Sequence, residues 1–386
     1  MKILLISPVG EDVHIRKIPA ALARQNAGGQ ARVEVTVIAP EKSATDAAYD
    51  ASGWHTVAEE PRENGFRLAT LALRNPAYSA EGFVRNAIAR VMKKTQPEII
   101  QVWGGAPDRH VSQVVWLKMR LCPRAKVVQY GFNNLPIRWG RRTRLKWKLL
   151  FPQMAGAIEA NSEGVQVMRE AGFRKPLERI FWGISTDAFH PVEKAGLRER
   201  LGFGAEKLIG YVGRFVAEKG LSDLLAALRR MPSEVHGVLI GAGPMQQELE
   251  REAAGPELCG RVRFFPTMPP EKLAEYMNCF DALALPSRTI PSWKEQYGRV
   301  IGEAMACGAV VVGSDSGAIP EVIGEAGLVV HEGDATALAE ALSRAVFDAP
   351  LRTKLITAGF RRVESELSIQ AMSGKLLRFY ERLIKA

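Results

Sequence analysis

The segment from Leu285 to Gly308, LPSRTIPSWKEQYGRVIGEAMACG, contains residue types that could hold a polar ligand. Glu295 and Glu303 lie on either side of the pair Tyr297-Gly298, and carboxylates accept hydrogen bonds from sugar and ribose hydroxyls. A helix that begins at Tyr297-Gly298-Arg299-Val300 would leave its first backbone amides free for a ligand. We therefore hypothesise that this segment holds an activated sugar by its hydroxyls and a nucleotide by its ribose and phosphates, although two glutamates at this spacing also occur by chance.

Carboxylates repel a diphosphate unless cations lie between them, and a second segment could supply those cations. Val212–Gly220, VGRFVAEKG, follows an apolar run typical of a strand and precedes a helical pattern. Gly213 would turn the chain so that backbone amides face a phosphate, and Arg214 and Lys219 would add two mobile positive charges. A tight turn with solvated charges fits the same residues, but cations on both sides of the loop favour a phosphate site.

A further glycine turn, Gly241-Ala242-Gly243-Pro244, follows the next predicted strand. Such a G-x-G pattern more often serves only to allow a tight turn. Its use in a binding site would be the close approach of Gly241 and Gly243 to a nucleotide.

The length and composition indicate a two-domain globular protein. The chain has 386 residues, of which 47% are apolar and 24% charged, and it contains no apolar run of the ~20 residues that would span a bilayer. Its first residues, MKILLISPVGEDVHI, are typical of a buried strand rather than of a secretory signal. Four scattered cysteines fit a reducing cytoplasm, and the absence of clustered His, Cys and Asp leads us to expect neither metal nor another cofactor.

The positive charge is concentrated in one region of the sequence. The net charge is +10, and residues 101–150 carry eleven Lys or Arg against one acid, Asp108. Within this region, the segment Arg138–Phe151 (RWGRRTRLKWKLLF) would place Trp139, Trp147, Leu150 and Phe151 on one side of a helix and most cations on the other; the six cations are Arg138, Arg141, Arg142, Arg144, Lys146 and Lys148.

This pattern leaves two interpretations open. A basic helix that contains tryptophan is typical of an element that lies on an anionic membrane surface, where each cation contributes about 1 kcal/mol. A solvated helix whose tryptophans fill the core of the N-terminal domain fits equally well. Nucleic acid is less favoured, because no known binding module accompanies the charge.

The alternation of apolar runs and helical patterns predicts parallel βαβ units in both halves. We expect an α/β fold with two Rossmann-like, doubly wound domains that face a cleft, where ligands bind at the carboxyl ends of the strands. The predicted strands are Lys2–Ser7, Val33–Ile38, Arg67–Leu73, Glu98–Trp103, Lys126–Tyr130, Gly156–Ala160, Arg179–Trp182, Leu208–Val212, Gly237–Gly241, Arg261–Phe265, Ala282–Leu285, Ala309–Val312 and Leu328–Val330. The predicted helices include Ile15–Gln25, Glu81–Lys94, Asp108–Leu121, Gly164–Ala171 and one that begins at Leu221, and residues 41–60 are predicted to form a loop.

Taken together, VGRFVAEKG, GAGP, LPSR, EQYGRVIGEAMACG and VVGSDSGAIPEVIG resemble the C-terminal domain of the family 4 retaining glycosyltransferases of the GT-B fold. The resemblance covers residues 205–345 in detail and the N-terminal half in outline. It implies an N-terminal acceptor domain over residues 1–190 and a nucleotide-sugar domain over 191–360. A last segment over 361–386 would cross back to the first domain.

The resemblance also implies roles for the residues above. Arg214 and Lys219 would clamp the donor diphosphate, and Glu295 would accept a hydrogen bond from a sugar hydroxyl. The amides of Tyr297 and Gly298 would support the same sugar, those of Arg299 and Val300 would reach a phosphate, and Glu303 would hold the ribose. No metal would be needed, because positive side chains and helix dipoles stabilise the departing diphosphate.

The N-terminal half departs from the family pattern in two places. Only Gly10 matches the usual glycine pair of the first loop, and Gln129-Tyr130-Gly131 stands where many members place a histidine. His14 and His110 are therefore candidates for an N-terminal site, although a lone histidine on a helix is more often structural. Gly183–Phe189 (GISTDAF) resembles the interdomain hinge, with Trp182 in place of the usual Asn.

We therefore predict a metal-independent, retaining glycosyltransferase that uses a UDP- or GDP-sugar. Its acceptor would be lipid-linked or a polysaccharide of the cell envelope, and the protein would be cytoplasmic or peripheral at the inner face of the membrane. Alternatives are a sugar phosphorylase or synthase of the same fold, a transferase for a small soluble acceptor, and an inactive homologue that only binds nucleotide sugars.

Overall fold

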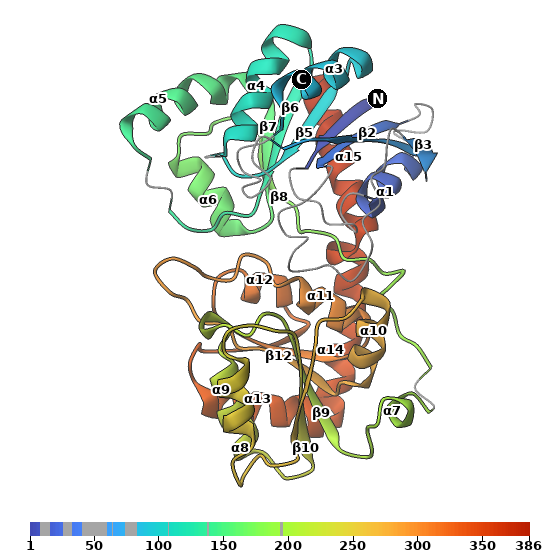
Figure 1. Ribbon diagram of the computed structural model, residues 1–386, viewed down its shortest axis with the longest axis vertical. Coiled ribbons are helices and arrows are strands. Elements are labelled where there is room, and N and C mark those ends of the chain that lie inside the picture. The colour runs from blue at the N-terminus through green and yellow to red at the C-terminus, as the bar shows by residue number, and fades with distance from the viewer. Residues whose placement is uncertain are drawn as a thin grey trace. The chain divides into compact units, whose positions relative to one another are not determined.

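The protein consists of two compact units. The computed structural model describes residues 1–7, 16–25, 33–40, 60–63, 65–73, 83–106, 108–136, 139–193 and 196–386 (Figure 1). Unit 1 comprises Met1–Gly183 together with Ile369–Ala386, and unit 2 comprises Ile184–Ser368. No helix among the residues described is both long enough and apolar enough to cross a membrane.

Unit 1 is built on a twisted sheet whose described strands have the order β3-β4-β2-β1-β5-β6-β7-β8. All neighbouring pairs are parallel except β3 with β4. The strands are β1 (Lys2–Ile6), β2 (Glu34–Pro40), β3 (Glu60–Glu63), β4 (Phe66–Leu71), β5 (Ile99–Trp103), β6 (Lys126–Gly131), β7 (Gly156–Glu159) and β8 (Leu177–Arg179). The helices are α1 (Ile18–Arg24), α3 (Arg85–Thr95), α4 (Arg109–Leu121), α5 (Arg141–Leu150), α6 (Ser162–Glu170) and α15 (Ile369–Lys385).

The central strand β5 of unit 1 is buried along its whole length because helices cover the sheet. All five residues of β5 are buried, as expected for a parallel strand inside a sheet covered on both faces. The C-terminal helix α15 packs against this unit: its Tyr380 hydroxyl donates to Gln101 Oε1 on β5. A side chain at Gly156 would place its Cβ 2.8 Å from the Phe379 ring, so glycine on β7 lets α15 approach the sheet.

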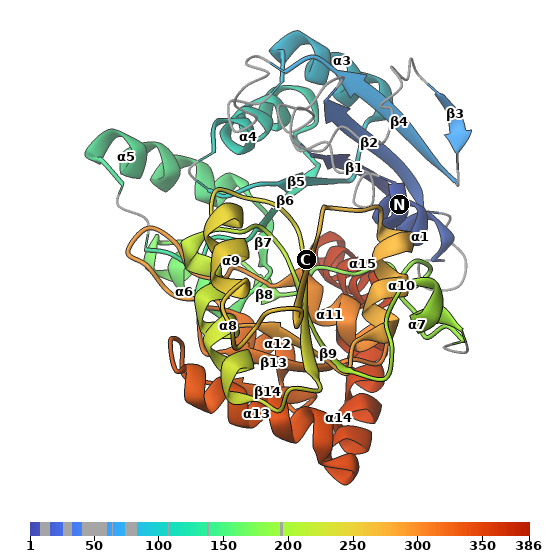
Figure 2. The ribbon, with the colours of Figure 1, turned by 60° about the horizontal axis from the view of Figure 1, so that its bottom comes forward.

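Unit 2 contains a parallel sheet with the order β11-β10-β9-β12-β13-β14. The strands are β9 (Lys207–Val212), β10 (Val235–Ile240), β11 (Val262–Phe265), β12 (Ala282–Leu285), β13 (Val310–Ser314) and β14 (Gly327–Val330). The helices are α7 (Leu197–Arg200), α8 (Leu221–Arg230), α9 (Gln246–Ala253), α10 (Pro270–Cys279), α11 (Arg299–Ala306), α12 (Ile319–Ile323), α13 (Ala335–Phe347) and α14 (Ala349–Arg362). Figure 2 shows α13 close to β13 and β14, both of which it contacts.

The predicted α/β class with two Rossmann-like units is confirmed, and every predicted strand lies at or beside an observed one. The strand predicted at Arg179–Trp182 is misplaced: β8 ends at Arg179 because its neighbour β7 ends at Glu159, with which Arg179 is paired. The antiparallel edge strand β3 was not predicted, and its first residue, Glu60, is the last of the predicted loop. Residues 41–59 of that loop lie outside the described residues.

The divisions between the units differ from the predicted positions 190 and 361. Residues from Ile184 onward belong to unit 2 because Ile184 N donates to Leu367 O at 2.7 Å. Further along, Asn278 of α10 bonds the His190 carbonyl and the Val192 amide. The chain re-enters unit 1 only at Ile369, since a short π-helix over Val363–Leu367 still contacts α11.

Candidate functional site

The predicted donor residues gather at the carboxyl ends of four strands in unit 2. The loops that carry them follow β9, β10, β12 and β13, which end at Val212, Ile240, Leu285 and Ser314. Gly213 N donates to Ile240 O at 3.0 Å and Phe215 N to Ala242 O at 2.8 Å, so the loop of Gly213 and Arg214 runs beside the loop of Gly241 and Gly243. In a parallel sheet this edge is where ligands bind.

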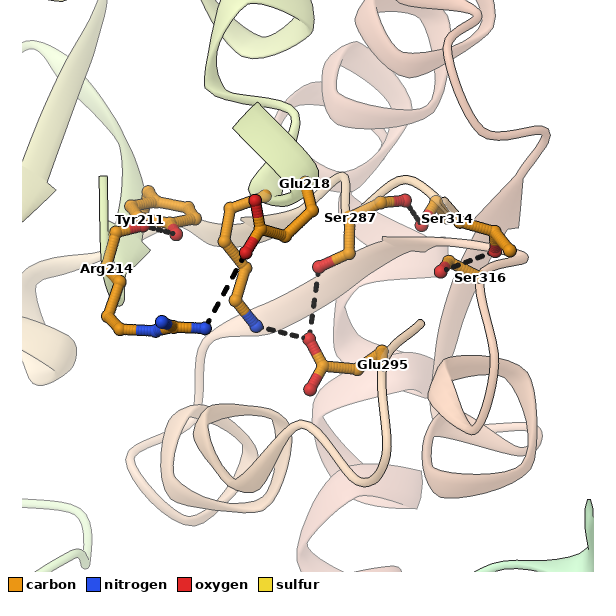
Figure 3. A network of polar contacts seen from close by, with 9 residues as sticks. Tyr211, Arg214, Glu218, Ser287, Glu295, Ser314 and Ser316 are labelled. Atoms are coloured by element: carbon orange, nitrogen blue, oxygen red, sulfur yellow. Dashed lines mark hydrogen bonds and ion pairs between the residues drawn. The ribbon is translucent and has the colours of Figure 1, made fainter. Parts of the chain in front are cut away.

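Lys219 and Glu295 form a direct ion pair, 76 positions apart in sequence (Figure 3). Lys219 Nζ lies 2.6 Å from Glu295 Oε2, and their side chains are only 13% and 9% exposed. Ser287 Oγ donates to the same carboxylate oxygen at 3.1 Å, and the Trp293 ring centre lies 4.6 Å from Lys219 Nζ. We call Lys219, Glu295, Ser287 and Trp293 the lysine network.

The loop geometry places Lys219 by a contact that requires glycine. Ala217–Lys219 form a single turn of 3-10 helix, and Gly220 then begins α8 with a left-handed φ of 66°. A Cβ at Gly220 would lie 1.9 Å from the Pro286 carbonyl oxygen, so the Lys219 loop and the Pro286–Ser287 segment can touch only with glycine there. This contact brings Lys219 and Ser287 to the same carboxylate.

Glu295 is held from the other side by the loop after β13. Its carbonyl oxygen accepts a hydrogen bond from Ala318 N at 2.9 Å. A Cβ at Gly317 would lie 2.1 Å from the same oxygen, which shows how closely the two backbones approach. Ser314 Oγ donates to Ser287 O at 2.5 Å. Glu295 and Ser287 are therefore both held by hydrogen bonds from residues at or just after the end of β13.

Arg214 has a different environment from Lys219. Its side chain is 61% exposed, and its Nη2 lies 3.8 Å from Glu218 Oε1 in the same loop. The Arg214 carbonyl accepts a hydrogen bond from the Tyr211 hydroxyl at 2.9 Å. Burial, followed by the charge of Glu295, raises the pKa of Tyr211 far above its ordinary value, so this phenol stays a neutral donor.

Glu303 pairs with Arg299 on α11, with Arg299 Nε 3.0 Å from Glu303 Oε1. The helix begins after Gly298, whose φ is 73°, and a Cβ there would lie within 3.0 Å of Leu285 and Ile301 side chains. Tyr297, which precedes it, is buried, and that burial raises the pKa of its hydroxyl. The predicted helix start at 297–300 is therefore observed, with Arg299 and Val300 in its first turn.

Several polar residues of the site were not singled out in the sequence. These are Glu218, Ser287, Trp293 and the pair Asp223–Arg288, in which Arg288 Nε donates to Asp223 Oδ2 at 2.6 Å. This hydrogen bond holds the pKa of Arg288 above its ordinary value. Glu218 and Ser287 lie inside the VGRFVAEKG and LPSR segments. Their position next to predicted site residues in the sequence could have identified them.

The loop after β13 carries one more ion pair at the border of the site. His331 Nδ1 lies 2.8 Å from Asp315 Oδ2, and this contact raises the pKa of the imidazole. The pKa of Asp315 is lowered, chiefly by the hydrogen bonds from His331 and from the Glu332 amide. An open cavity of about 700 Å³ lies beside this pair, with Arg288, Thr289, His331 and Glu332 among its lining residues.

The N-terminal candidates are placed less favourably. Gly10 and His14 lie outside the described residues, as does Arg138 of the basic segment. His110 is 1% exposed, and its Nε2 lies 2.8 Å from the Trp103 carbonyl oxygen, so its ring is part of the interior of unit 1. Gln129 donates to Glu159 Oε1 at 3.1 Å, and burial raises the pKa of Glu159 to about 8.

The burial of the aromatic side chains decides between the two interpretations of the basic segment. Trp147, Leu150 and Phe151 are buried in the core of unit 1, with Trp139 packed against it. The Trp147 and Phe151 ring centres lie 5.3 Å apart. The interpretation in which tryptophans fill the N-terminal core is confirmed, and the aromatic side of α5 is not a surface that could meet a membrane.

Residues that could ligate a metal do not cluster in the described parts of the chain. Groups of three or more His, Cys, Asp or Glu side chains suitably placed for one ion are not found there.

Comparisons with known proteins match the part of the chain that carries these residues. The profile of the family "Glycosyl transferases group 1" matches residues 194–362, which include the Lys219–Glu295 and Arg299–Glu303 ion pairs. An alpha-maltose-1-phosphate synthase of Mycolicibacterium smegmatis is 30% identical, with 67% of this chain and 69% of that protein covered. A GDP-mannose-dependent alpha-(1-6)-phosphatidylinositol monomannoside mannosyltransferase of the same species is 34% identical over 45% of this chain and 47% of its own length. The chain spans about half the length of most curated relatives that it matches.

Solved structures match over the whole chain. Sucrose-phosphate synthase from Thermosynechococcus elongatus has a TM-score of 0.75 at 21% identity and covers 100% of this chain and 99% of its own. Anabaena HepE in complex with UDP and glucose has a TM-score of 0.71 at 17% identity, with 99% and 100% covered. At these identities the likeness concerns the fold, two Rossmann-like units in one chain.

Proposed function

Since the chain belongs to the glycosyl transferases group 1 family and has the GT-B fold, we propose that it transfers a sugar from a nucleoside-diphosphate donor to an acceptor. The observation that carries this proposal is the lysine network. A buried ammonium is fixed against a carboxylate at the carboxyl edge of the sheet, and an arginine loop lies beside it. Such an arrangement suits a ligand that carries both hydroxyls and phosphates.

Lys219 would stabilise the charge that develops on the departing diphosphate. Its ammonium has three N–H donors, of which Glu295 engages one, so the others can reach phosphate oxygens. The exposed Arg214 can swing onto the same diphosphate, because its contact with Glu218 is long and screened by solvent. The Glu295 carboxylate, which Lys219 and Ser287 hold at this position, would accept a hydrogen bond from a hydroxyl of the donor sugar.

Glu303 would hold the ribose, and the first turn of α11 would bind a phosphate. Arg299 neutralises Glu303 at 3.0 Å and so limits its repulsion of the diphosphate. Arg299 and Val300 form the first turn of α11, where the helix dipole favours an anion.

The chemical step would retain the configuration at the anomeric carbon and would need no metal. The bond from that carbon to the phosphate oxygen breaks, and the acceptor oxygen attacks the same face. The acceptor proton passes to the departing phosphate oxygen. Arg214, Lys219 and the helix dipole would supply the positive charge that a metal supplies in other transferases.

The names of the relatives favour two classes of acceptor. One relative acts on phosphatidylinositol monomannoside, a lipid, while another is a D-inositol 3-phosphate glycosyltransferase from Corynebacterium jeikeium. We propose a lipid-linked or polysaccharide acceptor for this chain, with the enzyme peripheral at the inner face of the membrane. A small soluble acceptor is the alternative that the second name favours.

The test is transfer or hydrolysis measured with a panel of UDP- and GDP-sugars. We expect Lys219→Ala to lower kcat by about 10²–10³, the typical cost of removing one charge-stabilising donor. Lys272→Ala, an exposed lysine of α10, serves as the matched control and should leave kcat unchanged. Near-normal turnover of Lys219→Ala would contradict the role given to the network.

Two further measurements test the finer parts of the proposal. Activity should survive EDTA, and a strict requirement for a divalent ion would overturn the metal-independent step. The anomeric configuration of the product, followed by NMR, should match that of the donor. An enzyme that turns over no donor but is stabilised by a nucleotide sugar would instead be a binding homologue.

A further inference from the structure

The outward face of α5 combines exposed leucines with unpaired cations. Leu145 and Leu149 are 60% and 62% exposed, the highest values among the exposed large hydrophobic residues described. Successive helical residues are turned by about 100°, which places this pair opposite the buried Trp147 and Leu150. The helix therefore has one apolar stripe in the core and a second, smaller one in the middle of its solvent face.

Cations lie on both sides of the exposed leucines. Arg141, Arg142, Arg144 and Lys148 are exposed, and in the described parts of the chain no acidic side chain lies within ion-pair distance of them. The first turn of α5 contains two arginines and no acid. Positive charge at a helix start opposes the helix dipole and so destabilises the helix. Sequences break such local rules mostly where function requires it.

The neighbouring helix α4 extends this surface. Lys146 of α5 donates to Ser112 Oγ of α4 at 3.0 Å, so the two helices meet at this point. Trp116 lies one turn after Ser112, on the same side of α4, and is 48% exposed. Burial, and then the charge of Arg109, lowers the pKa of Lys146, which reflects the density of positive charge between the helices.

We propose that this surface, made of Leu145, Leu149, Trp116 and the four cations of α5, docks on an anionic lipid bilayer. Leucines would enter the boundary between headgroups and acyl chains, the indole would lie at the headgroup level, and the cations would contact lipid phosphates. The surface belongs to unit 1 and contains no residue of the donor site. The proposal rests on the proposed function only for its purpose, which is to bring the enzyme to a lipid-linked acceptor.

The chemistry of the face favours a bilayer over other anionic partners. Nucleic acid and soluble polyphosphates are bound by cations alone or with stacking aromatic rings, so exposed leucines in the middle of the cations would contribute nothing to them. An acidic protein surface would require the cations at the rim and would bury far more area than one short helix presents. A bilayer would contact the exposed leucines with its acyl chains and the cations with its phosphates.

The experiment is vesicle sedimentation of the full chain. Vesicles of phosphatidylcholine alone are compared with vesicles that also contain phosphatidylglycerol, at low and raised salt. Wild-type protein should sediment with the anionic vesicles only, and raised salt should weaken the association. The variant Arg141→Gln/Arg142→Gln/Arg144→Gln should partition about 100-fold less, since each cation near an anionic surface contributes about fivefold.

A matched control removes the same charge elsewhere. Arg251, Lys272 and Lys354 are exposed residues of unit 2, and their triple replacement by Gln should leave sedimentation unchanged. Equal loss in both triple variants would overturn the proposal, because it would show a general charge effect. Lack of binding by wild-type protein to anionic vesicles would overturn it as well.

The leucines distinguish insertion from simple charge attraction. Leu145→Ser/Leu149→Ser should bind at low salt and lose binding at raised salt, whereas the control Phe347→Ser, at an exposed position of α13, should not. Binding to a DNA duplex that is lost in the arginine variant but kept in the leucine variant, with no vesicle binding, would replace the bilayer by nucleic acid. All variants should retain nucleotide binding in thermal shift, so failure of docking leaves the donor-site proposal standing.

Discussion

Glu159 is a single buried acid whose protonation affects the stability of unit 1. It is 2% exposed at the carboxyl end of β7, and its Oε1 accepts a hydrogen bond from Gln129. Burial raises its pKa to about 8. An acid whose folded pKa is raised stabilises the fold fully below its unfolded pKa of ~4.3, and that contribution is lost as pH rises through 8.

We predict that Glu159→Gln removes this pH dependence. In urea unfolding followed by circular dichroism, wild-type unit 1 should lose on the order of 3 kcal/mol between about pH 5 and pH 8, and the variant should not. The two proteins should therefore be similar near pH 5, with the variant more stable at pH 8. Glu170→Gln, at an exposed residue of α6, is the control and should track the wild type. A variant as pH-sensitive as the wild type would contradict the burial argument.

Residue types and spacing made Arg214, Lys219, Glu295 and Glu303 candidates, and the family resemblance supplied their proposed roles. They were insufficient for the pairings. That Lys219 meets Glu295 and not Glu218, one position away, depends on where α8 and β12 bring their loops. Such contacts between segments 76 positions apart are set by tertiary packing, which a local pattern does not encode.

Helix α8, which begins at the Lys219 loop, is anchored at its other end by one side chain. Arg261 Nη2 donates to Leu228 O at 2.9 Å, to Pro232 O at 3.0 Å and to Val235 O at 3.0 Å. The last carbonyls of a helix have no partner within the helix. A planar guanidinium can satisfy several of them at once, which an ammonium on a flexible stem cannot.

We predict that Arg261→Lys lowers the free energy of unfolding of unit 2 by about 1 kcal/mol, because the carbonyl oxygens of Leu228, Pro232 and Val235 lose their hydrogen bonds from the guanidinium. Urea unfolding of the full chain measures this. Arg251→Lys on α9 is the matched control: Arg251 is exposed and donates to Gln247 O at 3.3 Å, so its replacement should change stability little. Equal changes in the free energy of unfolding at both positions would show that the hydrogen bonds of the Arg261 guanidinium do not stabilise unit 2.

The predicted and observed elements differ mainly where a boundary depends on a neighbour. Apolar periodicity located both sheets, but β8 ends where β7 ends, and β3 exists only because β4 offers it an edge. On α5 the sequence separated an aromatic side from a basic one. The side of α5 that packs into the core is set by the tertiary structure and not by the helical pattern. The structure shows that the aromatic side is buried and that Leu145 and Leu149 are exposed on the opposite side.

At the scale of the whole chain, helix α15 packs in unit 1 although it follows unit 2 in the sequence. We predict that Tyr380→Phe, which leaves Gln101 Oε1 on β5 without its donor, lowers the thermal transition of unit 1 and not that of unit 2. Calorimetry of the full chain should then show one shifted and one unshifted transition. Addition of a nucleotide that binds the donor site should raise only the transition temperature of unit 2. A single transition that moves with both changes would contradict two separable units.

The return of α15 to unit 1 also bears on how the chain folds as it leaves the ribosome. The sheet of unit 1 emerges first, but the helix that covers β5 and β7 emerges only after all of Ile184–Ser368 has been made. At ~5–20 residues per second, that interval is roughly 10–40 s. During it unit 2 can close on its own contiguous segment, while the apolar face beneath α15 stays uncovered. Unit 1 should therefore reach its native packing only after α15 has emerged.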